Sequence, residues 1–318
     1  MNAWRALLPL LAVLLLGALF SGDGAFFAWE THRAVLREVS VMGMLACGMT
    51  VVILAGGIDL AVGSLLALGA VGFSWFVLRH AVSAWIALPA VLALGAAAGS
   101  VTGLLVARAR IPAFIASLAM MVFARGLAKH WSGGQKISTY VQTATGFQSV
   151  ALPRIFEALD ARVLGGQVAV VTLLFAASAL VVYVILERLR LGRYVYAVGG
   201  NYEAARLAGV PVRRVIVFSY AFSGLLAALA GICQAAQETQ GDPETGLGYE
   251  LDAIAMVVLG GTSLAGGRGR IGLTLIGALT LGYLQKVLSL NAYSTEARLM
   301  LTGAILIAAV LFQRRSAR

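Results

Sequence analysis

Long apolar stretches separated by short polar segments run along the whole chain. A helix needs about 20 mostly apolar residues to cross a bilayer, whereas a barrel strand needs only about 10. Because lipid offers the backbone no hydrogen bonds, apolar stretches of this length predict spanning helices. The sequence predicts an all-α polytopic membrane protein, a single transmembrane domain over residues 1–318 with about ten helices. We expect these helices at residues 4–20, 39–57, 61–78, 84–107, 112–128, 165–186, 215–233, 251–266, 271–290 and 298–313.

The composition agrees with this prediction. Hydrophobic residues make up 60% of the chain and charged residues only 12%, with a mean hydropathy of +0.90. Soluble domains are about 45–50% apolar and about 25% charged, so a soluble, disordered or collagen-like protein is excluded. The net charge of +10 would suggest nucleic acid for a soluble protein. In a membrane protein it reflects basic cytoplasmic loops, so we expect lipid and no nucleic acid around the chain.

Basic residues also predict the orientation of the chain. Six arginines lie in the segment 187–214, and more follow in the tail that begins at Arg314. Both segments are expected in the cytoplasm, because Lys and Arg concentrate in cytoplasmic loops. Counting spans back from these points places both termini in the cytoplasm and the loops 129–164 and 234–250 outside. The first apolar stretch has a second interpretation as a cleaved signal peptide, although no clear cleavage site follows it.

Two glycine-rich segments repeat at an offset of 204 residues. VVILAGGIDLAVGS (Val51–Ser64) matches MVVLGGTSLAGG (Met256–Gly267), so that glycine meets glycine at three positions. Membrane transporters often place substrate or gating elements where such Gly-interrupted helices face each other. The alternative is chance recurrence in a chain with 37 glycines. The functional interpretation places a translocation path or gate at Gly56, Gly57, Asp59, Gly63, Ser64, Gly260, Gly261, Ser263, Gly266 and Gly267.

Asp59 is an acid within an otherwise apolar segment. A carboxylate at membrane depth costs a few kcal/mol and is kept mostly where it lines a cavity, pairs with a base or caps a backbone break. Two roles stay open: a side chain along the path, or the N-cap of a helix that begins near Val62. The second repeat carries Ser263 at this position. Other polar residues available to a path are Ser219, Ser223, Gln285 and Asn291.

The segment 187–214 contains the pattern of a turn followed by a short helix. GGN precedes YEAARLAG, which predicts Asn201 as N-cap and Gly209 and Pro211 as the stop. One interpretation is that the helix docks into a groove on a soluble partner through a small apolar face. The other is that its arginines hold it on the anionic inner leaflet. The residues expected on the apolar face are Ala204, Ala205, Leu207 and Ala208.

Three stretches carry more specific motifs: GGIDLAVGSLLAL (Gly56–Leu68), GRYVYAVGGNYEAARLAGV (Gly192–Val210) and YELDAIAMVVLGGTSLAGGRGRIGLTLIGAL (Tyr249–Leu279). Through them the chain resembles the permease subunit of ribose-type ABC sugar importers, from about Val39 to Gln313. The resemblance implies the permease fold of the ribose/branched-chain type, ten helices and a location in the bacterial cytoplasmic membrane. Two departures are Ala61, where Ser is common, and the unusually acidic GDPETGLG.

The resemblance also implies partners. They are a second permease chain, identical or related, two cytoplasmic ABC ATPase domains and an external sugar-binding protein. In such importers the loop that matches Gly199 to Gly209 carries the coupling helix, which contacts the ATPase. The coupling residues implied in this chain are Gly199, Gly200, Asn201, Ala204, Ala205, Arg206, Leu207 and Gly209. The acidic loop 234–250 suggests a further hypothesis, that it steers the external protein through a basic rim.

No motif for catalysis occurs in the sequence. It contains no G-x-x-x-x-G-K-[ST] segment, no H-E-x-x-H and no G-x-S-x-G, and its two cysteines lie in apolar stretches. We therefore expect a non-enzymatic transport subunit with no cofactor or metal of its own. ATP and Mg²⁺ would be bound by the partner ATPase.

The sequence thus predicts the permease subunit of an ATP-driven sugar importer that works by alternating access. An ABC permease for branched-chain amino acids or nucleosides stays open as an alternative of the same class. An ion- or proton-coupled secondary transporter, with Asp59 as the relay group, is the alternative from another class. A scaffold without transport would leave the repeats unexplained.

Overall fold

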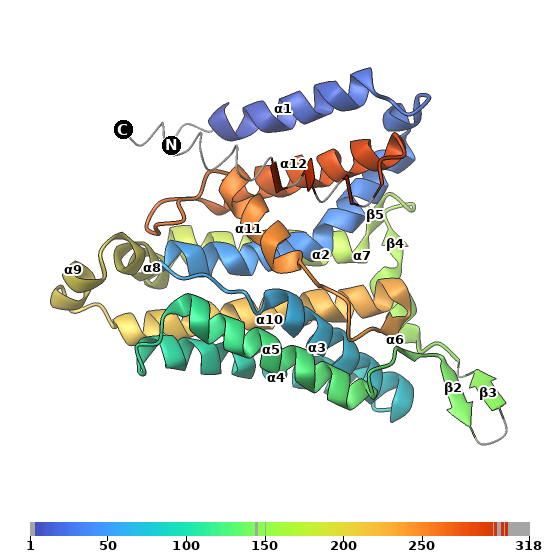
Figure 1. Ribbon diagram of the computed structural model, residues 1–318, viewed down its shortest axis with the longest axis horizontal. Helices are drawn as coiled ribbons and strands as arrows, with labels where there is room; N and C mark the ends of the chain where they lie inside the picture. Colours follow the sequence, from blue (N-terminus) through green and yellow to red (C-terminus); the bar gives the residue numbers. More distant parts are fainter. Residues whose placement is uncertain are drawn as a thin grey trace.

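The computed structural model describes residues 4–143, 146–149, 151–294, 296–297, 300–301 and 303–304. Long helices lie side by side and form one bundle (Figure 1). We call the end with α8, α9 and the turn at 108–112 the α9 end, and the opposite end, with the β2–β3 hairpin, the hairpin end. The long helices are α1 (Trp4–Leu19), α2 (Trp29–Leu54), α3 (Val62–Ser74), α4 (Ala84–Ala107), α5 (Ala113–Ser132), α7 (Val170–Tyr183), α10 (Val212–Glu238), α11 (Tyr249–Leu259) and α12 (Ile271–Leu290).

Shorter elements connect these helices. Two π-helical turns extend spans, η2 (Trp75–Arg79) after α3 and η3 (Val184–Arg188) after α7. The other short helices are η1 (Ala25–Phe27), α6 (Arg154–Asp160), α8 (Arg190–Gly200) and α9 (Tyr202–Leu207). The strands are β1 (Ile137–Ser138), β2 (Tyr140–Thr143), β3 (Gly146–Ser149), β4 (Arg162–Val163), β5 (Val168–Ala169) and β6 (Gln240–Gly241).

The prediction of about ten spans is not confirmed. Seven helices of the described residues are long and apolar enough to cross a membrane, and α1 and α11 are shorter. The apolar run at 251–266 is cut short because α11 ends at Leu259, before a glycine turn. The stretch 298–313 lies mostly outside the described residues.

Helix α2 begins at Trp29 rather than at residue 39. The sequence pattern missed this part because it is polar. Arg37 pairs with Asp160, the last residue of α6, and Lys286 of α12 pairs with Glu38 at 3.1 Å. These ion pairs let α2 continue beyond the apolar stretch that predicted it.

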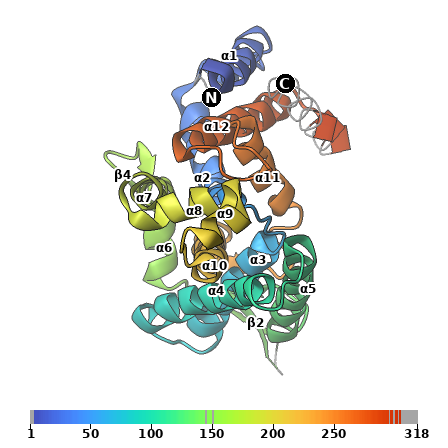
Figure 2. The ribbon, with the colours of Figure 1, turned by 90° about the vertical axis from the view of Figure 1, so that its left-hand side faces the viewer.

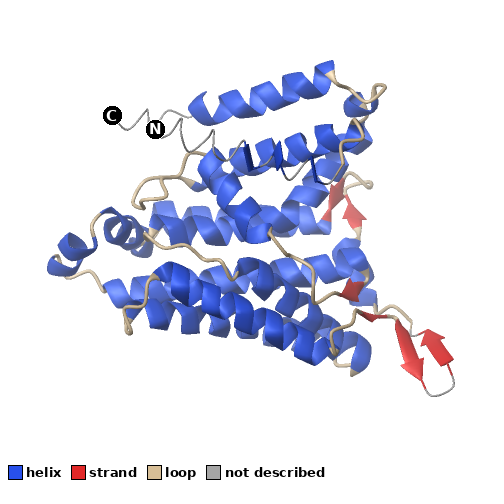
Figure 3. Ribbon diagram, viewed as in Figure 1, coloured by secondary structure: helices blue, strands red, loops and turns tan. Residues whose placement is uncertain are grey.

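The all-α prediction needs one addition at the hairpin end. Three two-stranded antiparallel sheets form there (Figure 3), in which β1 pairs with β6, β2 with β3 and β4 with β5. The first of these pairings joins the two loops 129–164 and 234–250. The loops expected outside the membrane are therefore ordered against each other in the described residues.

Helices α2, α3 and α10 form the centre of the bundle, with α4, α5 and α7 around them (Figure 2). Helix α10 packs against α4 at very close range. A Cβ atom on Gly224 of α10 would overlap the carbonyl oxygen of Gly95 of α4, and one on Gly95 would overlap that of Gly224. Small residues permit such backbone contact where lipid gives no hydrophobic drive for association. This contact fixes the position of α10, which anchors the site described next.

Ion pairs are unevenly distributed over the bundle. Six of the seven ion pairs among the described residues lie at the hairpin end, and the α9 end has one, between Arg206 and Glu203. The six are Arg33–Glu30, Arg37–Asp160, Lys129–Glu244, Lys136–Asp242, Arg162–Glu30 and Lys286–Glu38.

Candidate functional site

Both repeats end a helix in the same way at the α9 end. Gly56 after α2 and Gly261 after α11 have φ of +85° and +88°, the left-handed conformation that ends many helices. The next amide in each turn, Gly57 or Thr262, donates to the carbonyl five residues earlier, at 3.0 and 3.1 Å. At the helix ends Gly56 therefore corresponds to Gly261, one residue away from the predicted match with Gly260.

In the polar turns that follow these helix ends, equivalent residues are again 204 positions apart, as predicted for the two repeats. The Asp59 Oδ1 atom accepts a hydrogen bond from the Ala61 amide at 3.0 Å, and the Ser263 Oγ atom accepts one from the Ala265 amide at 3.3 Å. Both are local turns in which a side-chain oxygen replaces a backbone acceptor. The predicted correspondence of Asp59 with Ser263 is confirmed in this geometry.

Asp59 is only 1% exposed, and its second oxygen is bound to α10. The Ser223 hydroxyl donates to Asp59 Oδ2 at 2.8 Å, and the Tyr220 hydroxyl donates to the Ile58 carbonyl at 3.0 Å. Ser223 and Tyr220 lie one turn apart on α10, so two hydroxyls hold the break between α2 and α3.

The prediction that α3 begins near Val62 is confirmed, but Asp59 is not its N-cap. The N-cap position is held by Ala61, whose side chain forms no capping bond. Asp59 orders the turn immediately before the helix and ties that turn to α10. The carboxylate therefore satisfies local backbone and a neighbouring helix at the same time.

Glycines from three segments meet beside this break. Gly199, in the last turn of α8, touches Gly56 of the first repeat and Gly266 and Gly267 of the second. A Cβ atom on Gly199 would overlap the Leu54 carbonyl oxygen and lie 2.8 Å from the Gly267 nitrogen. We call Gly56, Gly199, Gly266 and Gly267 the glycine junction.

A backbone hydrogen bond and a tyrosine strengthen this junction. The Gly267 amide donates to the Leu54 carbonyl at 3.0 Å and thus joins the two repeats directly. The Tyr196 hydroxyl of α8 donates to the Gly269 carbonyl at 3.0 Å. Burial raises the pKa of Tyr196, and nearby Glu187 raises it further, so this hydroxyl stays a donor at neutral pH. Helix α8 is thereby fixed to both repeats.

The short helix α9 follows directly from the junction. The predicted N-cap is confirmed, because the Asn201 Oδ1 atom accepts from the Ala204 amide at 2.9 Å. Gly209, with φ of +78°, follows the helix as predicted. The expected apolar face is divided, since Ala205 is buried in the protein at 5% exposed and Leu207 is 82% exposed.

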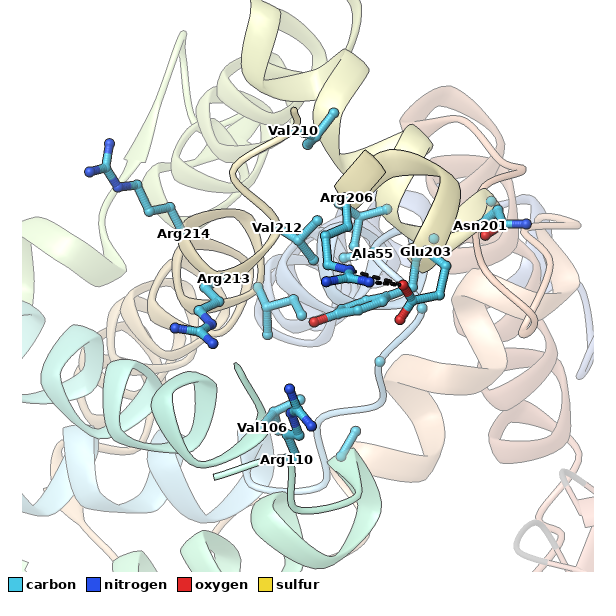
Figure 4. Close-up of a pocket in the computed structure, with 18 of the residues that line it drawn as sticks. Ala55, Val106, Arg110, Asn201, Glu203, Arg206, Val210, Val212, Arg213 and Arg214 are labelled. Carbon is cyan, nitrogen blue, oxygen red and sulfur yellow. Dashed lines mark hydrogen bonds and ion pairs between the residues drawn. The ribbon is translucent and has the colours of Figure 1, made fainter. Parts of the chain in front are cut away.

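A cavity of about 1300 Å³ opens at the α9 end. It lies between α9, the turn after α4 and the first turn of α10, and arginines from all three surround it (Figure 4). Gly56, Gly57 and Tyr220 line its inner part. The cavity therefore reaches the break that carries Asp59.

Other predicted site residues lie apart from the junction. Gly63, at the start of α3, faces the loop from the hairpin end, where a Cβ atom would overlap the Gly246 carbonyl oxygen. Gly260 packs against α12, and Ser64 is buried in α3. Asn291 donates to the Phe20 carbonyl at 2.9 Å, far along the chain from the break.

Two residues that contact the break between α2 and α3 or the first turn of α3, Tyr220 and Gly246, were not predicted from the sequence. Tyr220 had a usable signal, since it lies three residues before Ser223 in an apolar stretch and so shares a helix face with it. Gly246 had none, because its contact depends on how a long loop folds back. Within the described ranges, no three His, Cys, Asp or Glu side chains gather as a metal site.

Comparison with known proteins adds to this geometry. The family model described as branched-chain amino acid transport system / permease component matches residues 32–310. The ribose import permease protein RbsC of Escherichia coli (strain K12) is 42% identical over 320 residues, 99% of this chain and 95% of the relative.

Two further relatives are named for other sugars. The L-arabinose transport system permease protein AraH of Escherichia coli (strain K12) is 37% identical over 91% of this chain and 84% of the relative. The fructose import permease protein FrcC of Rhizobium meliloti is 34% identical over 90% and 78%. No solved structure matches the chain. Because the family model covers most of the chain, this multi-pass membrane protein belongs to the permease family of the branched-chain amino acid transport systems.

Proposed function

We propose that this chain is the permease subunit of an ATP-driven sugar importer in the bacterial inner membrane. Relatives of 34–42% identity, over nine tenths or more of the chain, are named as permeases for ribose, arabinose and fructose. The glycine junction carries the proposal, because it joins the segment before α9 to both repeats through backbone contacts. A coupling helix needs such a rigid connection to the path that it moves.

In this proposal the α9 end lies in the cytoplasm and the hairpin end outside. Arginines crowd the α9 end with few acids, as the positive-inside rule expects of cytoplasmic segments. Both termini then lie in the cytoplasm. Residues 187–214 form the coupling segment, and the loops 129–164 and 234–250 face the external sugar-binding protein.

The proposed mechanism is alternating access driven from outside the chain. A partner ATPase, which binds ATP and Mg²⁺, moves α9 through its exposed face at Leu207. Helix α8 transmits the movement because Gly199 and Tyr196 fix it to the repeat turns. The turns at Gly56 and Gly261 then change the angle between the helices that they join.

The break at Asp59 serves as the inner gate in this mechanism. Its bonds to Ser223 and Tyr220 hold the segment over the inner part of the cavity. Opening the path requires α10 to separate from the break. The hydrogen bonds of these two hydroxyls therefore stabilise the closed state relative to the open one. A second permease chain, identical or related, completes the membrane unit.

The test is reconstitution of the chain with its ATPase and sugar-binding protein in vesicles. Leu207→Asp is expected to abolish uptake and ATPase recruitment while the protein inserts normally, because a charge cannot be buried unpaired in the docking contact. Arg193→Gln, an exposed change on α8, is the control. Full recruitment by Leu207→Asp would refute the proposed role of α9.

Two other candidates are separated by the same preparation. The family description includes branched-chain amino acid transport, so a ligand screen on the cognate external protein decides between amino acids and sugars. Uptake by the purified chain without any ATPase, driven by a proton gradient, would favour a secondary transporter with Asp59 as relay.

A further inference from the structure

Three arginine side chains converge on the cavity at the α9 end, which we call the arginine cleft. Arg110 comes from the turn after α4, Arg206 from α9 and Arg213 from the first turn of α10. Figure 4 shows their guanidinium groups around the opening; Arg214 also contributes to the lining, but its guanidinium group points away from the opening. Positive charge from three separate elements is thus directed at one space.

These charges have little compensation within the chain. Arg206 pairs with Glu203 at 2.7 Å, and Arg110 and Arg213 form no ion pair or side-chain hydrogen bond with any residue that the structure describes. The three like charges repel one another, screened by water because the side chains are exposed, and the guanidinium groups of Arg110 and Arg213 stay free to bind an anion. An anionic occupant would relieve this repulsion.

The backbone at Arg110 adds to the argument. Arg110 has φ of +58°, a left-handed conformation that is uncommon for any residue other than glycine. Such conformations persist where the surrounding structure or a function requires them. Here the strained turn directs Arg110 toward the cleft, opposite Arg206 of α9 (Figure 4).

The size and lining of the cleft indicate its occupant. Sites for small molecules measure about 300–1,000 Å³, and this cavity is larger, at about 1300 Å³. Apolar side chains such as Val106, Val212 and Ile216 line the same cavity as the arginines. An acidic rim above an apolar anchor is the complementary surface, and a protein segment supplies both.

We propose that the arginine cleft receives an acidic segment of the partner ATPase, seated beside the exposed tip of α9. This inference rests on the proposed function, since it extends the docking contact from Leu207 to the neighbouring cleft. Arginine binds carboxylates with two parallel hydrogen bonds, which fix the orientation of the bound segment and add to its affinity. The ATPase would thus contact α9 on two sides, at Leu207 and at the cleft. A movement of the ATPase would then rotate α9 instead of breaking the contact.

Position favours a soluble partner over lipid. Helix α9 stands beyond the ends of the spans at the α9 end of the bundle (Figure 1), and Arg206 lines the cavity that opens there. Binding of anionic lipid in the cleft is therefore an outcome for the experiment to exclude.

The experiment compares arginines whose side chains point into the cleft, Arg110 and Arg213, with Arg214, whose side chain points away from it. Arg110→Gln with Arg213→Gln is expected to weaken ATPase binding to the permease in zwitterionic nanodiscs by roughly tenfold and to flatten its salt dependence. Arg214→Gln, one residue away and also exposed, is expected to bind like the wild type. Arg110→Lys with Arg213→Lys should restore part of the affinity, which a misfolded variant would not show.

Each other result has a definite meaning. Wild-type affinity in the double Gln variant overturns the inference, and so does an equal loss with Arg214→Gln. A loss that occurs only in nanodiscs with anionic lipid assigns the cleft to lipid and also overturns it. If Leu207→Asp also leaves the affinity unchanged, the proposed function fails; if Leu207→Asp abolishes binding, only the cleft inference fails.

Discussion

The two ends of this molecule differ in how many of their charged side chains form ion pairs within the chain. At the hairpin end acids and bases are paired within the chain, as in Lys129–Glu244 and Lys136–Asp242, and strand pairing joins the two loops. At the α9 end the arginines converge on a cleft with one internal ion pair. Ion pairs within the chain are thus concentrated at one end, and the other end keeps exposed arginines without an acid. The difference indicates where a charged partner adds most to stability.

The largest expected loss of sugar uptake follows from filling the glycine junction at the α9 end. Gly199→Ala is expected to reduce sugar uptake by the reconstituted importer at least about tenfold, because its Cβ atom would overlap the Leu54 carbonyl oxygen. Overpacking of this kind costs about 1–3 kcal/mol, which a thermal unfolding assay would detect.

Gly200→Ala is the matched control for that change. Nothing lies within 4 Å of a Cβ atom at Gly200, so uptake should stay near the wild-type level. Equal activity of the two variants would show that the junction transmits nothing.

The next effect separates the two faces of α9. Ala205→Asp places a charge inside the protein, where Ala205 is 5% exposed, and should destabilise the α9 region by about 3–5 kcal/mol. Proteolysis between residues 201 and 209 would report this opening. Leu207→Asp at the exposed face should leave the proteolysis rate unchanged, and faster cleavage there would contradict the assignment of faces.

A smaller effect is expected at the break between α2 and α3. Asp59→Ala removes the acceptor of both the Ala61 amide and the Ser223 hydroxyl and should cost about 1–3 kcal/mol of stability. Asp59→Asn keeps an oxygen for the amide, and its NH₂ group can donate to Ser223, so uptake should largely persist. Complete loss of uptake in Asp59→Asn with normal stability would mean that the charge itself is needed.

The smallest effect is expected where charge is already paired. Asp242→Asn with Glu244→Gln removes two ion pairs at the hairpin end, whose lysines are exposed, and should change the affinity for the external protein less than about twofold. The measurement is binding at low and high salt. A tenfold loss at low salt would support the hypothesis that this acidic loop steers the external protein.

Local features of the site were predictable from the sequence, and contacts between distant segments were not. Asn201, Gly209 and the start of α3 follow from rules that act within a few residues. The offset of the repeats predicted that Asp59 and Ser263 form equivalent turns. Each of these depends on its own neighbours in the chain.

The failures have physical reasons as well. The sequence gives Ala205 and Leu207 the same apolar character, and only packing against the bundle buries one and exposes the other. Nor does the sequence show that two other glycine turns, at Gly56 and at Gly266 and Gly267, approach Gly199 in the fold. The early start of α2 was missed because ion pairs with helices distant in the sequence, such as Arg37 with Asp160 of α6, stabilise a polar extension.

The contact between Gly63 and Gly246 has a consequence for communication across the membrane. Gly246 belongs to a loop that reaches inward from the hairpin end, and the Arg125 guanidinium holds that loop by donating to the Thr245 carbonyl at 2.7 Å. Only a few residues before Gly63, Gly56 touches α8 from the opposite side. In the proposed importer, the sugar-binding protein at the hairpin end and the ATPase at the α9 end would therefore both act on the short backbone segment from Gly56 to Gly63, and neither signal would have to cross the full thickness of the bilayer.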